Sequence, residues 1–239
     1  MSSDPIIELK NVWKKYKIKK QTTRTLREDI EKIFSRKYRK ELLIQGEFWS
    51  LSDINISINN CESVGLYGPN GSGKTTILKL LSRVTYPTRG ELNVRGSIAP
   101  LISVGAGFHP ELTGKENIYT NGTMLGMSIK ELREKESDII GFSGLDSKFL
   151  DLQVKNYSSG MNARLGFSIA VHSDADIFLL DEILAVGDTK FREKCAEKIN
   201  DLIGEKNKTF LIVSHQHDRL KELTDRIYYM EKGKITDLI

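Results

Sequence analysis

Cysteine and long apolar runs are scarce in this sequence of 239 residues. Its two cysteines, Cys61 and Cys195, match neither the spacing of a metal motif nor a disulfide framework, so a reducing cytosol fits. No run approaches the ~18 apolar residues that a membrane-spanning helix requires, and residues 1–5 do not begin a signal peptide. We therefore expect any membrane location to come through a partner.

A hydrophobic fraction of 39% indicates a sizeable core and about one domain over residues 1–239. Alternating apolar residues over 6–9 and 52–58 predict a small β subdomain. A helical lobe is expected at about 105–153, where the charged stretch 128–138 is typical of a helix.

Residues 68–75 carry the sequence GPNGSGKT, a complete phosphate-binding loop. An apolar run at 64–67 precedes it and predicts a buried strand, and an amphipathic run at 76–81 predicts a helix. Glycines let the backbone amides point inward, and the helix adds its positive end, which suits the phosphates of ATP. Lys74 would reach the terminal phosphates, and the Thr75 hydroxyl would bind Mg²⁺. The expected nucleotide-binding residues here are Gly68, Pro69, Asn70, Gly71, Ser72, Gly73, Lys74, Thr75 and Thr76.

Two further strand ends supply charged groups. The apolar run ending at Leu180 is followed by Asp181, expected to hold Mg²⁺, and by Glu182, the candidate general base for the attacking water. The run 210–213 is followed by Ser214 and His215, whose imidazole is expected to contact the γ-phosphate, although such a histidine taken alone is more often structural.

Two aromatic or small-residue segments are also candidates for nucleotide contact. Tyr16 is a candidate to stack on the adenine ring, with an exposed tyrosine on a basic strand as the alternative. Ser158, Ser159 and Gly160 come at the start of a predicted helix over 161–170, where a hydroxyl and bare amides favour an anion.

The order of these motifs resembles the ATP-binding cassette of ABC transporters over almost the whole chain. The resemblance implies an α/β fold: a P-loop NTPase core of mostly parallel sheet, a small antiparallel β subdomain and an inserted helical subdomain. It also implies a homodimer, in which Ser158 and Gly160 of one copy close over the γ-phosphate held by Lys74 of the other. Asp188 matches the family's dimer-contacting aspartate.

The sequence departs from the family pattern in two places. The usual Leu-Ser-Gly-Gly-Gln signature is Tyr-Ser-Ser-Gly-Met at 157–161, which keeps the serine and the second glycine. No glutamine occurs between the phosphate loop and Gln153, although the family has one that senses Mg²⁺ and the membrane partner; residues 101–105 occupy its expected place.

The signature spelling, together with GFHPELTG at 107–114 and Glu-Asn-Ile at 116–118, resembles the ATP-binding subunits of bacterial polysaccharide exporters. This resemblance implies an integral-membrane permease as partner, a lipid-linked polysaccharide such as O-antigen or teichoic acid as cargo, and a place on the cytoplasmic face of the inner membrane. The alternatives are export of another substrate, or a soluble ATPase of the same type acting on nucleic acid. Such ATPases usually carry a coiled-coil insertion, zinc-binding cysteines or a second cassette, so nucleic acid is not the expected partner.

Positive charge is concentrated between Lys14 and Lys40, which hold twelve Lys or Arg residues against three acids. Leu26, Ile30, Ile33 and Phe34 recur at helical spacing and predict a basic amphipathic helix. Three interpretations remain open: a solvated surface helix, contact with an anionic bilayer, or contact with the phosphates of a lipid carrier.

Overall fold

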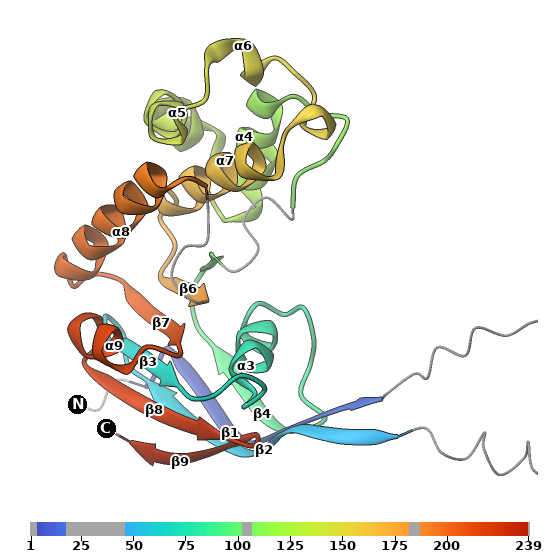
Figure 1. Cartoon of the computed structure of the whole chain (residues 1–239), viewed down its shortest axis with the longest axis vertical. Helices are drawn as coiled ribbons and strands as arrows, with labels where there is room; N and C mark the ends of the chain where they lie inside the picture. The colour runs from blue at the N-terminus through green and yellow to red at the C-terminus, as the bar shows by residue number, and fades with distance from the viewer. Residues whose placement is uncertain (1–3, 18–45, 102–106, 182–186, 239) are drawn as a thin grey trace, which may run out of the picture.

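A computed structural model of the chain describes residues 4–17, 46–101, 107–181 and 187–238. The described elements form a sheet-containing lobe and a helical lobe (Figure 1). Within these ranges, no helix is both long enough and apolar enough to cross a bilayer.

The central element of the sheet lobe is a six-stranded sheet of order β5-β6-β7-β3-β8-β9. Its first five strands run parallel, and β9 pairs antiparallel with β8. The strands are β3 (Ser63–Tyr67), β5 (Ile98–Pro100), β6 (Ile177–Asp181), β7 (Thr209–Ser214), β8 (Arg226–Glu231) and β9 (Lys234–Leu238).

A second sheet of three antiparallel strands has the order β2-β1-β4. It consists of β1 (Ile7–Lys17), β2 (Glu47–Ile58) and β4 (Arg89–Val94), so the expected strands at 6–9 and 52–58 are present and longer than predicted. The far ends of β1 and β2 form a ribbon that extends away from the lobe (Figure 1).

Successive side chains of the central strands point to opposite faces of the sheet, so the core has two layers. Leu179, Leu211 and Val213 pack towards α3 (Lys74–Leu81) and the three-stranded sheet. Their neighbours Phe178 and Phe210 point to the opposite face, because successive strand side chains alternate. That face is covered by α8 (Thr189–Gly204), α9 (His217–Leu223) and the carboxyl-terminal half of α7 (Ser159–Val171).

The helical lobe contains α4 (Gly114–Met124), α5 (Ile129–Ser143), α6 (Ser147–Leu150), the 3₁₀ turn η1 (Val154–Asn156) and the start of α7. Capping boxes begin α4 at Thr113 and α5 at Ser128, where the hydroxyl accepts from the backbone amide three residues on and the glutamate there accepts from the amide of the cap residue. The core of this lobe also takes in Leu165 and Ile169. Helix α7 therefore belongs to both lobes and connects them.

Candidate functional site

The phosphate-binding loop connects β3 to α3. Lys74 is 6% exposed, and its Nζ donates to the carbonyl oxygens of Gly68 at 2.6 Å and Pro69 at 3.0 Å. Gly73, the N-cap of α3, has φ 110°, and a Cβ there would lie 2.7 Å from Leu51 Cδ2 and 2.9 Å from the Ser50 carbonyl. Only glycine fits at this position.

Neighbouring strands support the loop from behind. The amide of Gly233, in the turn between β8 and β9, donates to the Ser72 carbonyl at 2.9 Å, and the amide of Ser52 on β2 donates to the Gly233 carbonyl at 2.8 Å. Ser50 on β2 shares a hydrogen bond of 2.8 Å with the Thr76 hydroxyl. Sequence reasoning did not identify Ser50 or Gly233, because both contacts depend on tertiary packing.

The loop has features that fit a bound polyphosphate. Ser72 is only 2% exposed, yet its hydroxyl has no hydrogen-bond partner among the described residues. A buried hydroxyl without a partner is costly unless a ligand satisfies it. Thr75, Asn70 and Gly71 are exposed on the same loop. The residues present therefore fit the phosphates of ATP and one hydroxyl ligand for Mg²⁺.

Strand register brings the acidic and imidazole candidates to the same edge of the sheet. Tyr67, which precedes the loop, pairs with Ser214, and Val213 pairs with Asp181. Adjacent strands are about 4.8 Å apart, so Asp181 and the residue after Ser214, His215, lie at the carboxyl edge beside the loop. Asp181 is half-buried and His215 is exposed. Glu182 lies outside the described residues.

Tyr16 lies on the ribbon, on the same face as Lys14. Its ring stacks on Phe48 with centroids 5.9 Å apart, and Lys14 Nζ lies 5.1 Å from its centroid. Lys14, two residues away and therefore on the same face, reaches the Thr85 hydroxyl at 2.6 Å in the loop after α3. Adenine stacking on Tyr16 stays a prediction.

Ser158 and Asp188 each begin a helix. The Ser158 hydroxyl is exposed and accepts from the Met161 amide at 3.2 Å, so Ser159 and Gly160 form the first turn of α7. This turn is in the helical lobe, whereas the phosphate loop is in the sheet lobe (Figure 1). The Asp188 carboxylate accepts from the Phe191 amide at 2.9 Å.

Arg164 on α7 contacts the start of α8 and the end of α5. Its guanidinium lies 3.7 Å from the Asp188 carboxylate and donates from Nε to the Ser143 carbonyl at 2.9 Å. It also lies over the Phe191 ring at 5.1 Å. One side chain from α7 therefore ties the carboxyl end of α5 to the start of α8, a role that the sequence pattern did not reveal.

Comparison with known proteins shows which family the chain belongs to. A profile described as "ABC transporter" matches residues 51–185, more than half of the chain. The chain belongs to the ABC transporter family. It is 37% identical to the O-antigen export system ATP-binding protein RfbB of Klebsiella pneumoniae over 235 residues, which cover 98% of this chain and 94% of that one.

A second relative and two solved structures extend the comparison. The cassette is 39% identical to the teichoic acids export ATP-binding protein TagH of Listeria monocytogenes serotype 4b, covering 97% of this chain and 66% of that one. Two dimeric structures of the cassette MJ0796, one in a post-hydrolysis state bound to ADP and Pi, superpose with a TM-score of 0.71 at 23% and 24% identity. They each cover 98% of this chain and 97% of that one, and they confirm the expected cassette fold.

The unusual signature residue Tyr157 has a structural partner in this cassette. Its ring is buried, and its hydroxyl donates to the Phe149 carbonyl at 2.6 Å; burial raises the pKa of this phenol. The ring lies so close to Gly114 that a Cβ there would be 2.0 Å from the hydroxyl oxygen. Tyr157 and Gly114 therefore fit each other, which connects the variant signature with the GFHPELTG segment.

The side chain of Asn117 holds that segment in place through hydrogen bonds. It is fully buried, and its side chain accepts from the His109 amide at 2.8 Å while donating to three carbonyls of the loop, those of His109, Leu112 and Thr113. Gln153 also supports this loop, by donating to the Glu111 carbonyl at 3.0 Å. The Asn117 side chain thus satisfies backbone groups of the loop that precedes α4, which fixes the conformation of that loop.

Two concavities lie on the surface of the described part of the cassette. A groove of about 630 Å³ lies between the lobes and is lined mostly by small or apolar residues, including Val84, Pro100, Gly107 and Met124. The glutamine that is missing was expected at 101–105, next to Pro100; of this stretch, residues 102–105 lie outside the described residues.

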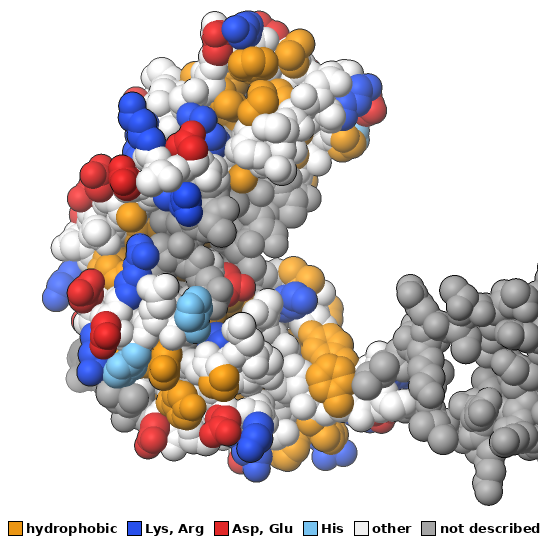
Figure 2. Space-filling model, viewed as in Figure 1, with side chains coloured by type: hydrophobic (Ala, Val, Ile, Leu, Met, Phe, Trp, Pro, Cys, Tyr) orange, Lys and Arg blue, Asp and Glu red, His pale blue; other side chains and the backbone are white. Residues whose placement is uncertain are grey.

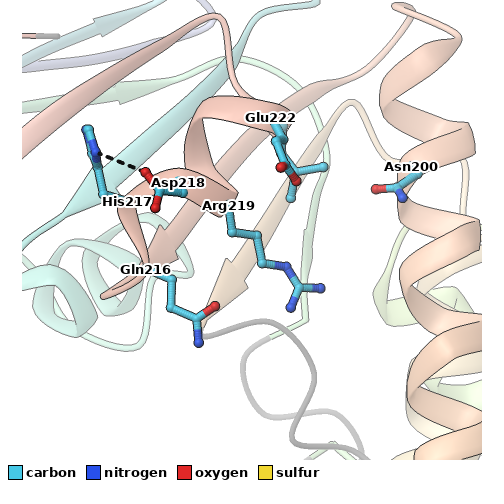
Figure 3. Close-up of a pocket in the computed structure, with 7 residues that line it drawn as sticks. Asn200, Gln216, His217, Asp218, Arg219 and Glu222 are labelled. Atoms are coloured by element: carbon cyan, nitrogen blue, oxygen red, sulfur yellow. Dashed lines mark ion pairs between the residues drawn. The ribbon is translucent and has the colours of Figure 1, made fainter.

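The second concavity, of about 600 Å³, lies between α8 and the start of α9. Arg219 and Glu222 extend towards it from α9 and Asn200 faces it from α8 (Figure 3). His217 also lines this pocket, and its ring lies 5.0 Å from the Tyr67 ring. No residue of the phosphate-binding loop is among those that line this pocket, although Gln216, which follows His215, is one of them.

Proposed function

We propose that this cassette is the ATP-hydrolysing subunit of a dimeric exporter of lipid-linked polysaccharide, located at the cytoplasmic face of a bacterial inner membrane. The observation that carries the proposal is the meeting of the phosphate loop, Asp181 and His215 at one sheet edge, with the exposed Ser158 turn in the other lobe. The proposed cargo is supported by the names of two relatives, which are an O-antigen and a teichoic acid export protein.

Each residue then has a distinct task. Lys74 exchanges its bonds to the loop carbonyls for bonds to the terminal phosphates, and the exposed Thr75 hydroxyl and the Asp181 carboxylate hold Mg²⁺. When bound, Mg²⁺ would neutralise the negative charge that develops on the phosphate oxygens. Glu182 orients and deprotonates the attacking water, and His215 contacts the γ-phosphate.

The second half of the site comes from another copy of the chain. The exposed first turn of α7 offers a hydroxyl and free helix amides to an anion. Because its own phosphate loop lies in the other lobe, a head-to-tail homodimer is the arrangement that brings this turn to a γ-phosphate. The Asp188 loop completes the dimer contact.

The groove between the lobes is where we place the permease. Val84 and Met124 at its edge are 72% and 71% exposed, and exposed apolar groups of this kind mark partner sites. Because both lobes line the groove, an occupant would detect any movement of one lobe relative to the other. A helical segment of the permease that faces the cytoplasm is the proposed occupant.

ATP hydrolysis is tested with two single variants. Lys74→Ala should lose both hydrolysis and ATP-driven dimerisation, because the phosphates lose their principal cation. Glu182→Gln should still bind ATP and accumulate as a dimer in gel filtration, since binding is spared and water activation is not. Wild-type turnover in Glu182→Gln would rule out its role as the base.

Sharing of the site is tested by mixing two inactive proteins, Ser158→Arg and Lys74→Ala. A mixed dimer contains one composite site without damage and one with both defects, so hydrolysis should partly return on mixing. If each site were built within one chain, mixing would restore nothing.

The exporter assignment is tested by purification from membranes. We expect an integral-membrane protein to co-purify with the chain and to be lost with Met124→Glu, while hydrolysis by the isolated subunit continues. Salt-sensitive binding to duplex DNA, with no membrane protein recovered, would favour the nucleic-acid alternative instead.

A further inference from the structure

Both tryptophans of the chain lie against each other on the ribbon formed by β1 and β2. The rings of Trp13 and Trp49 are 5.3 Å apart at an interplanar angle of 78°, an edge-to-face pair. Trp49 is 40% exposed, and neither ring belongs to the three hydrophobic cores of the described residues. Packing of the domain interior therefore does not account for this pair.

Cations flank the pair on the same face. Lys15 Nζ lies 5.5 Å and the Arg89 guanidinium 5.6 Å from the Trp49 ring centroid. Register agrees, because Lys15 pairs with Trp49 and Trp13 pairs with Arg89 across the strands. We call Trp13, Lys15, Trp49 and Arg89 the tryptophan platform.

Acidic groups are also present near the platform. Glu47 forms an ion pair of 2.6 Å with Lys15, and Glu91 follows Arg89 by two residues on β4. Arg89, beside Trp13, and Lys17, opposite Glu47 at the end of the ribbon, are both exposed, so Lys15, Lys17 and Arg89 outnumber the two acids. In the sequence, residues 18–45, which the ribbon strands flank, hold nine Lys or Arg residues against four acids. The charge of the platform and that of the adjoining sequence therefore have the same sign.

The platform is not part of the nucleotide site. Tyr16 and Lys14, which reaches Thr85 in the loop after α3, alternate along β1 with Trp13 and Lys15, so the two sets lie on opposite faces of the ribbon. Neither of the two concavities described above is lined by platform residues. Apolar side chains also gather on the sheet lobe close to where the ribbon leaves it (Figure 2). The platform is thus a partly exposed face on a projecting edge, away from both of these concavities.

We propose that the tryptophan platform rests on the surface of an anionic lipid bilayer. Tryptophan prefers the interface between hydrocarbon and water, where its ring is partly apolar and its N–H is hydrated. Each Lys or Arg near an anionic surface contributes about 1 kcal/mol, a factor of about five in affinity. An open pleated face that combines both residue types matches a planar, negatively charged surface. This contact requires neither ATP nor a permease, so it goes beyond the proposed export function.

The platform supplies its own reporter, because every tryptophan of the chain belongs to it. The full chain is titrated without ATP with vesicles of phosphatidylcholine and phosphatidylglycerol in equal parts, or of phosphatidylcholine alone. We expect the tryptophan emission to shift to shorter wavelength, and to be quenched by brominated acyl chains, with the anionic vesicles only. High salt should weaken the effect.

Matched variants test the charge contribution. Arg89→Gln should lower vesicle affinity about fivefold, the equivalent of about 1 kcal/mol. Arg95→Gln, the same change at an exposed arginine paired with Asp4 next to the other end of β4, should not change it. Trp13→Phe leaves Trp49 as the only emitter and should keep the spectral shift. Unchanged ATP hydrolysis in all three verifies that they are folded.

Three results would overturn the proposal. The first is co-sedimentation with anionic vesicles while tryptophan emission stays constant, which assigns binding to other residues. The second is failure to bind anionic vesicles at low salt. The third is an emission shift that appears only when a permease is present in a neutral bilayer, which makes the platform a protein contact.

Discussion

The effect of Gly114→Ala on stability should depend on the residue at position 157. We expect the change to destabilise the protein with Tyr157 and to be neutral or slightly stabilising in the Tyr157→Phe background. A Gly→Ala change that the backbone tolerates usually stabilises a protein by about 0.4–1 kcal/mol, because it reduces the freedom of the unfolded chain. Here the new Cβ would lie 2.0 Å from the Tyr157 hydroxyl oxygen and 3.1 Å from Cζ of the same ring. The ring is buried and its hydroxyl is bound to the Phe149 carbonyl, so it cannot withdraw without losing that bond.

The cost follows from these contacts. Overpacking of this kind destabilises by about 1–3 kcal/mol, so we expect Gly114→Ala to lower the free energy of unfolding by about 2 kcal/mol. Tyr157→Phe removes the clashing oxygen and costs about 1 kcal/mol for the lost hydrogen bond. In the Tyr157→Phe background the remaining contact of 3.1 Å requires only a small shift, so Gly114→Ala should be neutral or slightly stabilising there, within about 0.5 kcal/mol of zero. The coupling energy between the two positions is then at least about 1 kcal/mol.

Urea unfolding of the four proteins, followed by circular dichroism, measures this cycle. Gly141→Ala is the control, since a Cβ at this position in α5 meets nothing within 4 Å. Since Tyr157 directly precedes Ser158, Gly114→Ala should also reduce ATP-driven dimerisation, and Tyr157→Phe should restore it. Equal costs of Gly114→Ala in both backgrounds would refute the close fit between these residues.

Other predictions concern thiol chemistry, acid stability and the link between lobes. Burial raises the pKa of Cys195 to about 12, so a thiol reagent at pH 8 should label only Cys61 in the folded protein and both cysteines in urea; rapid labelling of two thiols in the native state would contradict this. Burial lowers the pKa of His172 below its ordinary value, so the unfolded chain binds the extra proton first and stability falls as pH drops below ~6.5. His172→Gln should show a flatter loss between pH 7 and 5 in the same unfolding assay, and an unchanged slope would exclude His172 as a cause. Arg164→Ala leaves a carbonyl unpaired and should cost about 1–3 kcal/mol, against less than about 0.5 for the exposed Arg192→Ala; equal losses would show that the bridge contributes nothing.

Much of the fold was predictable because local patterns carry it. Alternating and continuous apolar runs located β3, β6 and β7, and helical periodicity located α3 and α7. Strand β9 was not predicted, since its five residues hold few apolar groups and it exists through pairing with β8. Helix α5 extends beyond the expected 128–138 stretch, to Ser143, where its last turn packs against the other helices of the lobe.

The sequence by itself predicted which residues carry the chemistry of this protein. Lys74, Thr75, Asp181 and the Ser158 helix start are each specified by neighbours within a few residues, because phosphate binding depends on loop geometry and helix ends. Tertiary structure alone decided which groups meet. Parallel pairing brought Asp181 and His215 beside the loop, and folding of the two lobes joined Arg164 to Asp188. It also placed Trp13 against Trp49, 36 positions apart in the chain, on the outer face of the ribbon. Such contacts connect residues far apart in the chain, and their geometry depends on packing that no local pattern records.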